Sequence, residues 1–193
     1  GAAVPVTVKG IEAELSWRAS DRFNFGLVAS YSDGQIKGGV IPCNDLNGDN
    51  VADTVATAPS VAQLQAAYGA NNIGSCNVSQ RSAQQSPFSA TAQAEYKHPV
   101  SGNLEFFARG LFTYYGASKV DPTLSFDDLG SYGLFNLFGG LRAADGRWEV
   151  NLFARNLFNR KFLAEVIPAI EFGGSFITPG TRRMIGVEGS FKF

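Results

Sequence analysis

Apolar and polar side chains alternate along seven segments of this chain, and no other feature restricts the fold as strongly. In the clearest segment, 88–97, apolar residues fill the even positions and polar residues fill the odd positions. Strict alternation is typical of a β-strand with one apolar and one polar face. In 131–142 hydrophobic residues occupy both faces, so the facing of that segment is ambiguous. The predicted strands are 8–18, 23–31, 88–97, 104–115, 131–142, 147–158 and 183–193.

The connections between these segments alternate between short and long. Short turns fall at 20–22, 98–103 and 144–146, and long connections at about 35–86, 117–130 and 159–181. Outer-membrane barrels place tight turns in the periplasm and long loops outside the cell, and strands of about ten residues suit a tilted membrane crossing. The sequence therefore predicts an all-β, transmembrane antiparallel β-barrel. We expect the connection 35–86 to be a polar, strandless extracellular loop.

Aromatic residues gather at both ends of the predicted strands. Rings at both ends are what two membrane interfaces would select, although aromatic residues also favour strands in general. At the ends next to short turns and at the C-terminus stand Trp17, Phe23, Trp148, Phe191 and Phe193. At the ends next to long loops stand Tyr31, Tyr114, Tyr115 and Tyr132.

Seven strands are an odd number, whereas single-chain bacterial barrels have an even number with both termini in the periplasm. Open edges inside lipid would leave backbone N–H and C=O groups unpaired. We therefore expect further strands to precede Gly1. The chain start has no signal-peptide pattern, which indicates a processed chain or a fragment.

Three motifs resemble those of TonB-dependent receptors. The segment 9–15, with Gly10, Glu12 and Glu14, resembles their G-x-E-x-E strand. The segment 151–162 is similar to their penultimate strand, with Asn159 where Asp is usual and Phe162 where Tyr is usual. The segment 179–193 resembles their last strand. The resemblance implies that 1–193 is the C-terminal part, seven strands, of a 22-stranded barrel, whose plug domain and earlier strands are not in this sequence.

The resemblance also implies a function and a set of partners. Such receptors reside in the bacterial outer membrane among lipid and lipopolysaccharide, and they take up a scarce nutrient, most often a ferric siderophore. They bind an extracellular small-molecule ligand and are driven by TonB–ExbB–ExbD through the plug. The terminal Phe193 resembles the signal that the barrel-assembly machinery recognises. It is equally an interfacial aromatic residue.

Two cysteines, Cys43 and Cys76, both lie within the connection 35–86. A pair confined to one loop outside the cytosol indicates a disulfide, with two free thiols as the alternative.

The same connection contains the first part of an EF-hand-type calcium loop. Asn50, at position 6, can adopt the left-handed conformation that glycine usually supplies. Ala56 stands at position 12 in place of the usual Glu, so a distant carboxylate such as Asp33 would have to complete the site. The alternative is an acidic, turn-rich surface loop. The candidate ligands are Asp45, Asn47, Asp49, Asp53 and the carbonyl of Val51. Apart from this ion we expect no cofactor.

Charged residues on the polar side of the strands are predicted to line the barrel interior, mostly solvated or paired with one another. They are Glu12, Glu14, Arg18, Glu95, Lys97, Glu105, Arg109, Arg142, Glu149, Arg155, Glu188 and Lys192. The sole histidine, His98, is expected in a periplasmic turn, at the wrong end for a Ser–His pair facing a substrate. We expect no enzymatic activity. The net charge of −1 indicates no nucleic-acid binding.

Two alternatives to active uptake remain open from the sequence. One is a passive porin or a secretion-type barrel, which would lack a plug and a TonB box. The other is a soluble adhesive β-domain, in which the aromatic rows would pack against a second sheet.

Overall fold

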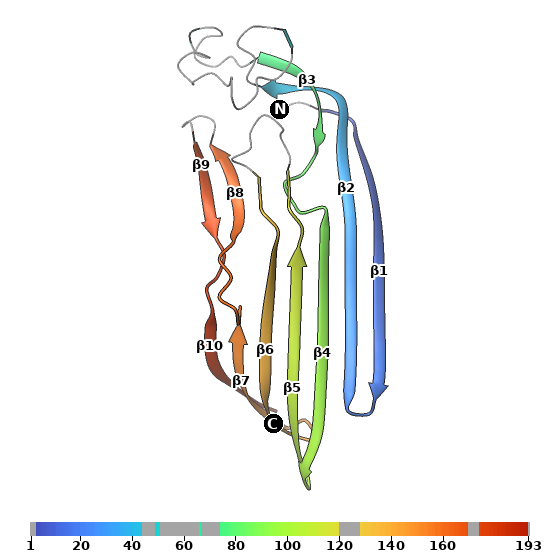
Figure 1. Ribbon diagram of the computed structural model, residues 1–193, viewed down its shortest axis with the longest axis vertical. Helices are drawn as coiled ribbons and strands as arrows, with labels where there is room; N and C mark the ends of the chain where they lie inside the picture. Colours follow the sequence, from blue (N-terminus) through green and yellow to red (C-terminus); the bar gives the residue numbers. More distant parts are fainter. Residues whose placement is uncertain are drawn as a thin grey trace.

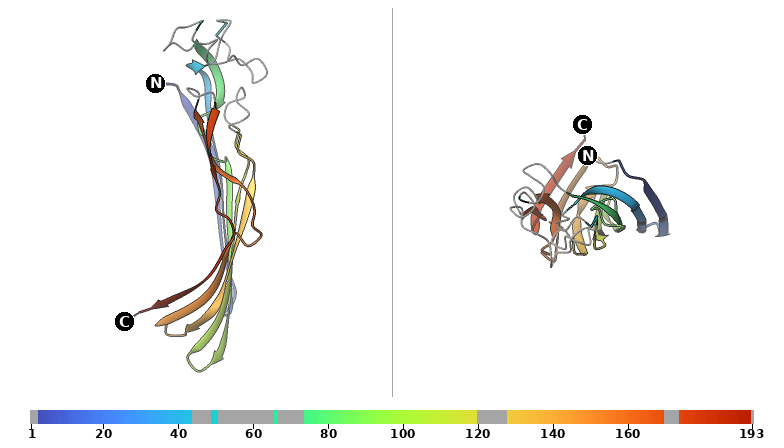
Figure 2. Two further views of the ribbon diagram at one scale, coloured as in Figure 1. Left: turned by 90° about the vertical axis from the view of Figure 1, so that its left-hand side faces the viewer. Right: turned by 90° about the horizontal axis from the view of Figure 1, so that it is seen from above.

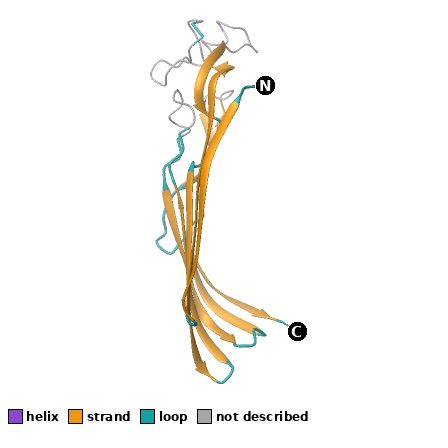
Figure 3. Ribbon diagram, turned by 90° about the vertical axis from the view of Figure 1, so that its right-hand side faces the viewer, coloured by secondary structure: helices purple, strands orange, loops and turns teal. Residues whose placement is uncertain are grey.

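A computed structural model describes residues 3–43, 49–50, 66, 74–119, 128–169 and 174–192. Strands account for nearly all of this structure (Figure 3). They are β1 (Val6–Ser20), β2 (Phe23–Cys43), β3 (Gly74–Arg81), β4 (Phe88–Ser101), β5 (Leu104–Tyr115), β6 (Tyr132–Ala143), β7 (Trp148–Arg155), β8 (Leu163–Ala169), β9 (Gly174–Pro179) and β10 (Met184–Phe191). No helix in the described part of the chain is long and apolar enough to cross a membrane.

The main sheet is antiparallel and has eight strands: seven in the order β1-β2-β4-β5-β6-β7-β10, and β3, which pairs with the far part of β2 (Figure 1). The seven strands in this order confirm the seven predicted strands. The sheet is curved into an arc when it is seen along the strands, and the N- and C-termini lie at opposite ends of its long axis (Figure 2). We call the end with the tight turns at 21–22, 102–103 and 144–147 the turn end, and the opposite end, with β3, β8 and β9, the loop end.

The register aligns the alternating patterns of neighbouring strands, so that the sheet has one apolar and one polar face. One row across the sheet contains only apolar residues and glycine: Trp17, Phe25, Ala94, Gly110, Leu137, Ala154 and Ile185. The same register resolves the ambiguous strand β6, because it places Phe135 and Leu137 on the apolar face and Leu134 and Phe138 on the polar face. Most of the large hydrophobic side chains of the apolar face are exposed; Leu152, for example, is 63% exposed.

Three further strands lie in two of the long connections, one of which, 35–86, was expected to be strandless. β2 continues past Tyr31 to Cys43 and pairs there with β3, while β8 and β9 form a separate hairpin in the third connection. Alternation does not reveal the β2–β3 ladder because a register shift between Lys37 and Gly39 interrupts it, and Gly38 has a φ of 66°. The expectation of a strandless 35–86 loop is therefore wrong at both of its ends.

The aromatic residues at the loop end divide between the two faces. Tyr31 and Tyr114 lie on the apolar face, as expected for an interface. Tyr115 and Tyr132 are paired on the polar face, so the interpretation of these two rings as membrane-interface residues is wrong. At the turn end, Trp17 packs edge-on against Phe23 at 6.5 Å between ring centroids on the apolar face.

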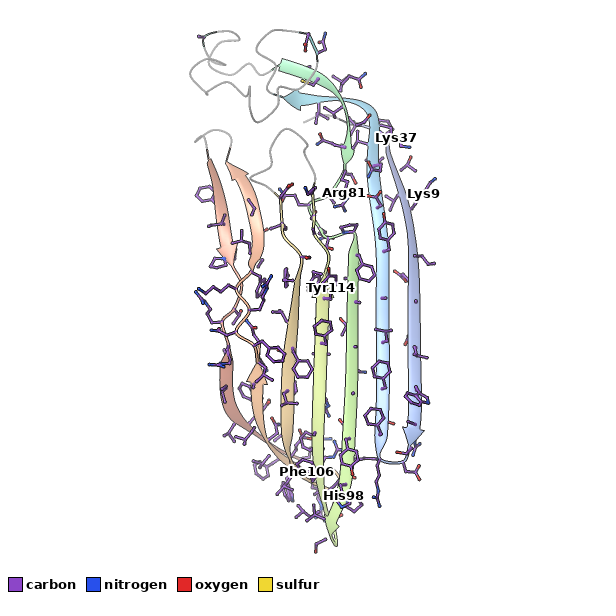
Figure 4. All side chains as sticks on the ribbon, in the orientation of Figure 1. Lys9, Lys37, Arg81, His98, Phe106 and Tyr114 are labelled. Atoms are coloured by element: carbon purple, nitrogen blue, oxygen red, sulfur yellow. The ribbon has the colours of Figure 1, made fainter. Side chains whose placement is uncertain are left out.

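His98 also differs from its predicted place. It lies within β4, opposite Phe106 and stacked on Tyr96 at 6.4 Å, and the turn itself begins at Gly102. His98 and Phe106 both lie near the turn end, and Lys9, Lys37 and Arg81 lie towards the loop end (Figure 4).

Candidate functional site

Three aromatic rings gather at the loop end of the polar face. β5 ends at Tyr115 and β6 begins at Tyr132, and the two residues are register partners with ring centroids 5.2 Å apart. Phe162, which precedes β8, stacks on Tyr132 at 4.2 Å. Gly180 donates its N–H to the carbonyl of Phe162 at 2.9 Å, and a Cβ atom at Gly180 would run into the Phe162 ring. Glycine at this position therefore permits the close approach that holds the stack.

A cavity of about 850 Å³ adjoins these rings. Its lining comes from the segment before β4, from the ends of β4, β5 and β6, from the bridge between Ser118 and Leu129, and from β8 and β9. The described residues that line it are Ala83, Gln84, Gln85, Ser86, Ser89, Tyr115, Gly116, Ser118, Leu129, Gly130, Tyr132, Ala164, Glu165 and Thr178. Hydroxyl, amide and phenol groups on a partly apolar surface are typical of a site that binds a small polar molecule.

Arg81, the last residue of β3, stabilises the cavity lining through an ion pair and two hydrogen bonds. Its Nε lies 3.1 Å from the carboxylate of Asp33, its Nη1 donates to the hydroxyl of Ser118 at 3.0 Å, and its Nη2 donates to the carbonyl of Gln85 at 2.9 Å. Gln35 donates to the same Asp33 carboxylate at 2.9 Å. Through these bonds Arg81 links two parts of the cavity lining, the segment before β4 and the bridge at Ser118, to strand β2.

Asn156 fixes the β8–β9 hairpin relative to β7. Its side chain accepts the N–H of Arg160 at 2.8 Å and donates to the carbonyls of Arg160 and Thr181 at 2.9 Å each. Asn159 accepts the N–H of Arg183 at 3.1 Å. Both asparagines have positive φ, 48° and 51°, a conformation that Asn tolerates better than most residues. Asparagine at position 159 thus has a structural role where the related motif usually has Asp.

An ionic cluster occupies the polar face nearer the turn end. Arg142 contacts Glu105 at 2.7 Å and Glu95 at 3.0 Å, and Arg109 contacts Glu95 at 2.6 Å. Both guanidinium groups lie over the ring of Phe107, at 5.0 Å and 5.7 Å, and Phe107 is completely buried. Four of the charges predicted to line the interior are therefore paired with one another. This cluster neutralises itself and fixes the positions of β4, β5 and β6.

Comparison with known proteins identifies the family. A family model described as TonB dependent receptor-like, beta-barrel, matches residues 4–157. The chain belongs to this family. The ferric yersiniabactin uptake receptor FyuA from Yersinia pestis matches the structure with a TM-score of 0.64 at 13% sequence identity. That match covers 97% of this chain and 24% of FyuA, so the chain spans about a quarter of that receptor. No curated protein matches the chain.

Membership in the TonB-dependent receptor family confirms the sequence resemblance and the antiparallel barrel fold. Proteins of this family are transporters of the outer membrane. The sheet of this TonB-dependent receptor segment has β1 at one edge and β10 at the other, and among the described strands neither edge pairs with a further strand.

The two cysteines of this receptor segment come close through the β2–β3 ladder. Cys43 is opposite Gly74, and Cys76 is opposite Ile41, so the two cysteines are diagonal neighbours in the ladder. Cys76 is completely buried. The disulfide between them remains a prediction.

Peptide mapping under non-reducing conditions tests this disulfide. We expect a Cys43–Cys76 cross-linked peptide in protein isolated from the cell envelope, because the ladder holds the two backbones together in an oxidising compartment. Alkylation of both thiols without prior reduction would contradict the prediction, and the same digest after reduction serves as the control.

The calcium hypothesis concerns residues that lie mostly outside the described part of the chain. Asp45, Asn47, Val51 and Asp53 are outside it, as is Phe193, the predicted assembly signal. Asp49 is described, and Asn50 has the expected left-handed conformation with a φ of 63°. Asp33 is bonded to Arg81 and Gln35, so it is an unfavourable candidate to complete the site. Calcium binding and the role of Phe193 stay predictions.

The sequence did not indicate the residues of the cavity. Tyr115 was assigned with its neighbour Tyr114, although adjacent residues of a strand point to opposite faces. The even or odd position of each tyrosine in its strand was therefore the one sequence signal that separates Tyr115 from Tyr114. Nothing in the local sequence indicates that Ser118, Tyr132 and Glu165 line one cavity, because the β8–β9 hairpin and the bridge at Ser118 bring them together.

Proposed function

We propose that this chain forms part of an outer-membrane transporter that takes up a scarce nutrient by TonB-dependent active transport. A ferric siderophore-like compound is the proposed substrate. The observation that carries the proposal is the family match over residues 4–157, together with a polar cavity at the loop end of the polar face. FyuA, which shares the fold, is a ferric yersiniabactin uptake receptor.

In this proposal the apolar face contacts membrane lipid and the polar face lines the barrel lumen. The loop end lies outside the cell, next to lipopolysaccharide, and the turn end lies in the periplasm. An exposed apolar face of this size in a single sheet requires a nonpolar partner, and lipid supplies one without a second layer of protein. Ligand entering from outside meets the cavity first. TonB–ExbB–ExbD acts through a plug domain, and the barrel-assembly machinery inserts the protein.

Uptake measurements in cells that produce the full-length protein test this proposal. We expect iron-limited cells to accumulate a radiolabelled ferric siderophore, and we expect deletion of TonB or addition of a protonophore to abolish accumulation. Energy-independent uptake that scales with substrate concentration would instead indicate a passive porin. Cells that lack the receptor serve as the control for uptake by other routes.

A further inference from the structure

The apolar face ends at a charged residue on both edge strands. On β1 this face is apolar as far as Ile11, and the next position on the same side is Lys9. On β10 it is apolar as far as Ile185, and the next position by alternation is Arg183. In the proposed orientation, Lys9 and Arg183 therefore lie where the hydrocarbon layer gives way to the lipid head groups.

Arg183 belongs to a junction at which the β8–β9 hairpin meets β7 and β10 (Figure 1). Hydrogen bonds hold the segments 159–162 and 180–183 side by side in this junction. The buried side chain of Asn156 bonds to both segments. Arg183 contributes only its backbone N–H to this network, which Asn159 accepts at 3.1 Å, so its guanidinium group takes no part in that bond.

Four basic residues gather in this junction, and all four are exposed. We call them the basic cluster: Arg160, Lys161, Arg182 and Arg183. Among the carboxylates that the structure describes, none forms an ion pair with any of the four. The described carboxylates nearest to them in sequence are Glu165, which lines the cavity, and Glu188, which is opposite Asn151 on the polar face. The cluster therefore has four positive charges that the described residues do not neutralise.

The surroundings of the basic cluster differ from those of the cavity on the polar face. None of the four residues is among the described residues that line that cavity. Instead, an exposed aromatic ring precedes the cluster in sequence: Phe158 is 77% exposed, and its ring centroid lies 5.9 Å from that of Phe135 on the apolar face. The junction thus combines an apolar ring on the lipid side with a group of cations, which is the combination that an anionic lipid requires.

We propose that the basic cluster binds the phosphate groups on the lipid anchor of lipopolysaccharide in the outer leaflet. This inference rests on the orientation of the sheet in the proposed function. Guanidinium groups bind phosphate oxygens through paired, charge-assisted hydrogen bonds, and a lysine adds a point charge. Each basic residue at a membrane surface strengthens the binding of an anionic head group by about 5-fold. The acyl chains lie against Phe158 and the apolar face, and the phosphates contact Arg183 and its basic neighbours.

Binding of lipid A, the lipid anchor, to the purified full-length receptor in detergent tests this site. The probes are lipid A with both of its phosphates and lipid A from which both have been removed, and native mass spectrometry measures the bound fraction. We expect the wild-type receptor to bind the phosphorylated form at least about 10-fold more tightly. Arg182→Gln/Arg183→Gln removes two charges and keeps the backbone bond to Asn159. It is expected to lose at least about 10-fold in affinity for the phosphorylated form alone.

Arg22→Gln/Lys192→Gln is the matched control, because it removes two exposed positive charges at the turn end. It is expected to bind both lipids as the wild-type receptor does. Equal binding of the two lipids by the wild-type receptor, or an equal loss in both double variants, would overturn the lipid site.

Uptake of a labelled ferric siderophore by the same variants separates this inference from the proposed function. Normal uptake by a receptor without preference for the phosphorylated lipid would overturn the lipid site and leave the transport proposal intact. Uptake that falls in Arg182→Gln/Arg183→Gln while lipid binding is unchanged would overturn the lipid site by assigning the basic cluster to an anionic ligand. If the phosphates control lipid binding and the wild-type receptor takes up no siderophore, the lipid site stands and the proposed substrate class is wrong.

Discussion

Leu152→Arg is expected to prevent stable assembly of the protein in the membrane. Leu152 lies mid-strand on the apolar face, opposite Gly139 and Val187, and is 63% exposed. An arginine on the lipid face near the midplane costs about 2–4 kcal/mol, which is a large part of the stability of a typical domain. The readout is the fraction of full-length protein that reaches the outer membrane in folded form.

Gln93→Arg is the control for this variant. Gln93 is an exposed residue of the polar face of β4, opposite Gly26 and Leu111, so an arginine there stays solvated in the lumen. Asn151, the residue next to Leu152, is a poor control because it is only 7% exposed. If both arginine variants assembled equally well, the assignment of the apolar face to lipid would be wrong.

Arg142→Met is expected to lower the unfolding temperature of the assembled protein markedly. The change removes the ion-pair partner of Glu105 and one of the two cations over Phe107, while Glu95 keeps Arg109. Because the pairs are mostly shielded but not fully buried, the expected loss is about 2 kcal/mol, between the values for exposed and buried pairs. Heat-dependent mobility of the folded barrel in SDS gels measures the shift.

Two further variants distinguish the effect of breaking the ionic cluster from a general effect of removing an arginine. Arg18→Met breaks the exposed ion pair with Asp21 and is expected to change stability by less than about 0.5 kcal/mol. The double variant Arg142→Met/Glu105→Met is expected to recover part of the loss, because it removes the unpaired carboxylate as well. Equal melting of Arg142→Met and Arg18→Met would show that the cluster contributes nothing.

The strands that have one apolar and one polar face were predictable from the sequence. In β4 every even position from Phe88 to Tyr96 is apolar, because one face must be nonpolar along its whole length. Beyond that nonpolar band the constraint disappears, which explains why β3, β8 and β9 were missed. In β6 the pattern was blurred because Leu134 and Phe138 place hydrophobic side chains on the polar face.

The candidate site depends on contacts between residues far apart in sequence, and the local pattern does not report them. Arg81 binds Asp33 from 48 positions away and Ser118 from 37 positions away. The position of Glu165 depends on the fold around Asn156 and on the hairpin that follows it.

If this segment belongs to an outer-membrane barrel, one face of its sheet contacts lipid while the other lines an aqueous lumen. Spin labels at each position of β4 from 88 to 97, in reconstituted full-length protein with serine at positions 43 and 76, measure this directly. We expect lipid-soluble oxygen to relax the labels at even positions and not those at odd positions. Uniform exposure of both sets to a water-soluble relaxing reagent would contradict it.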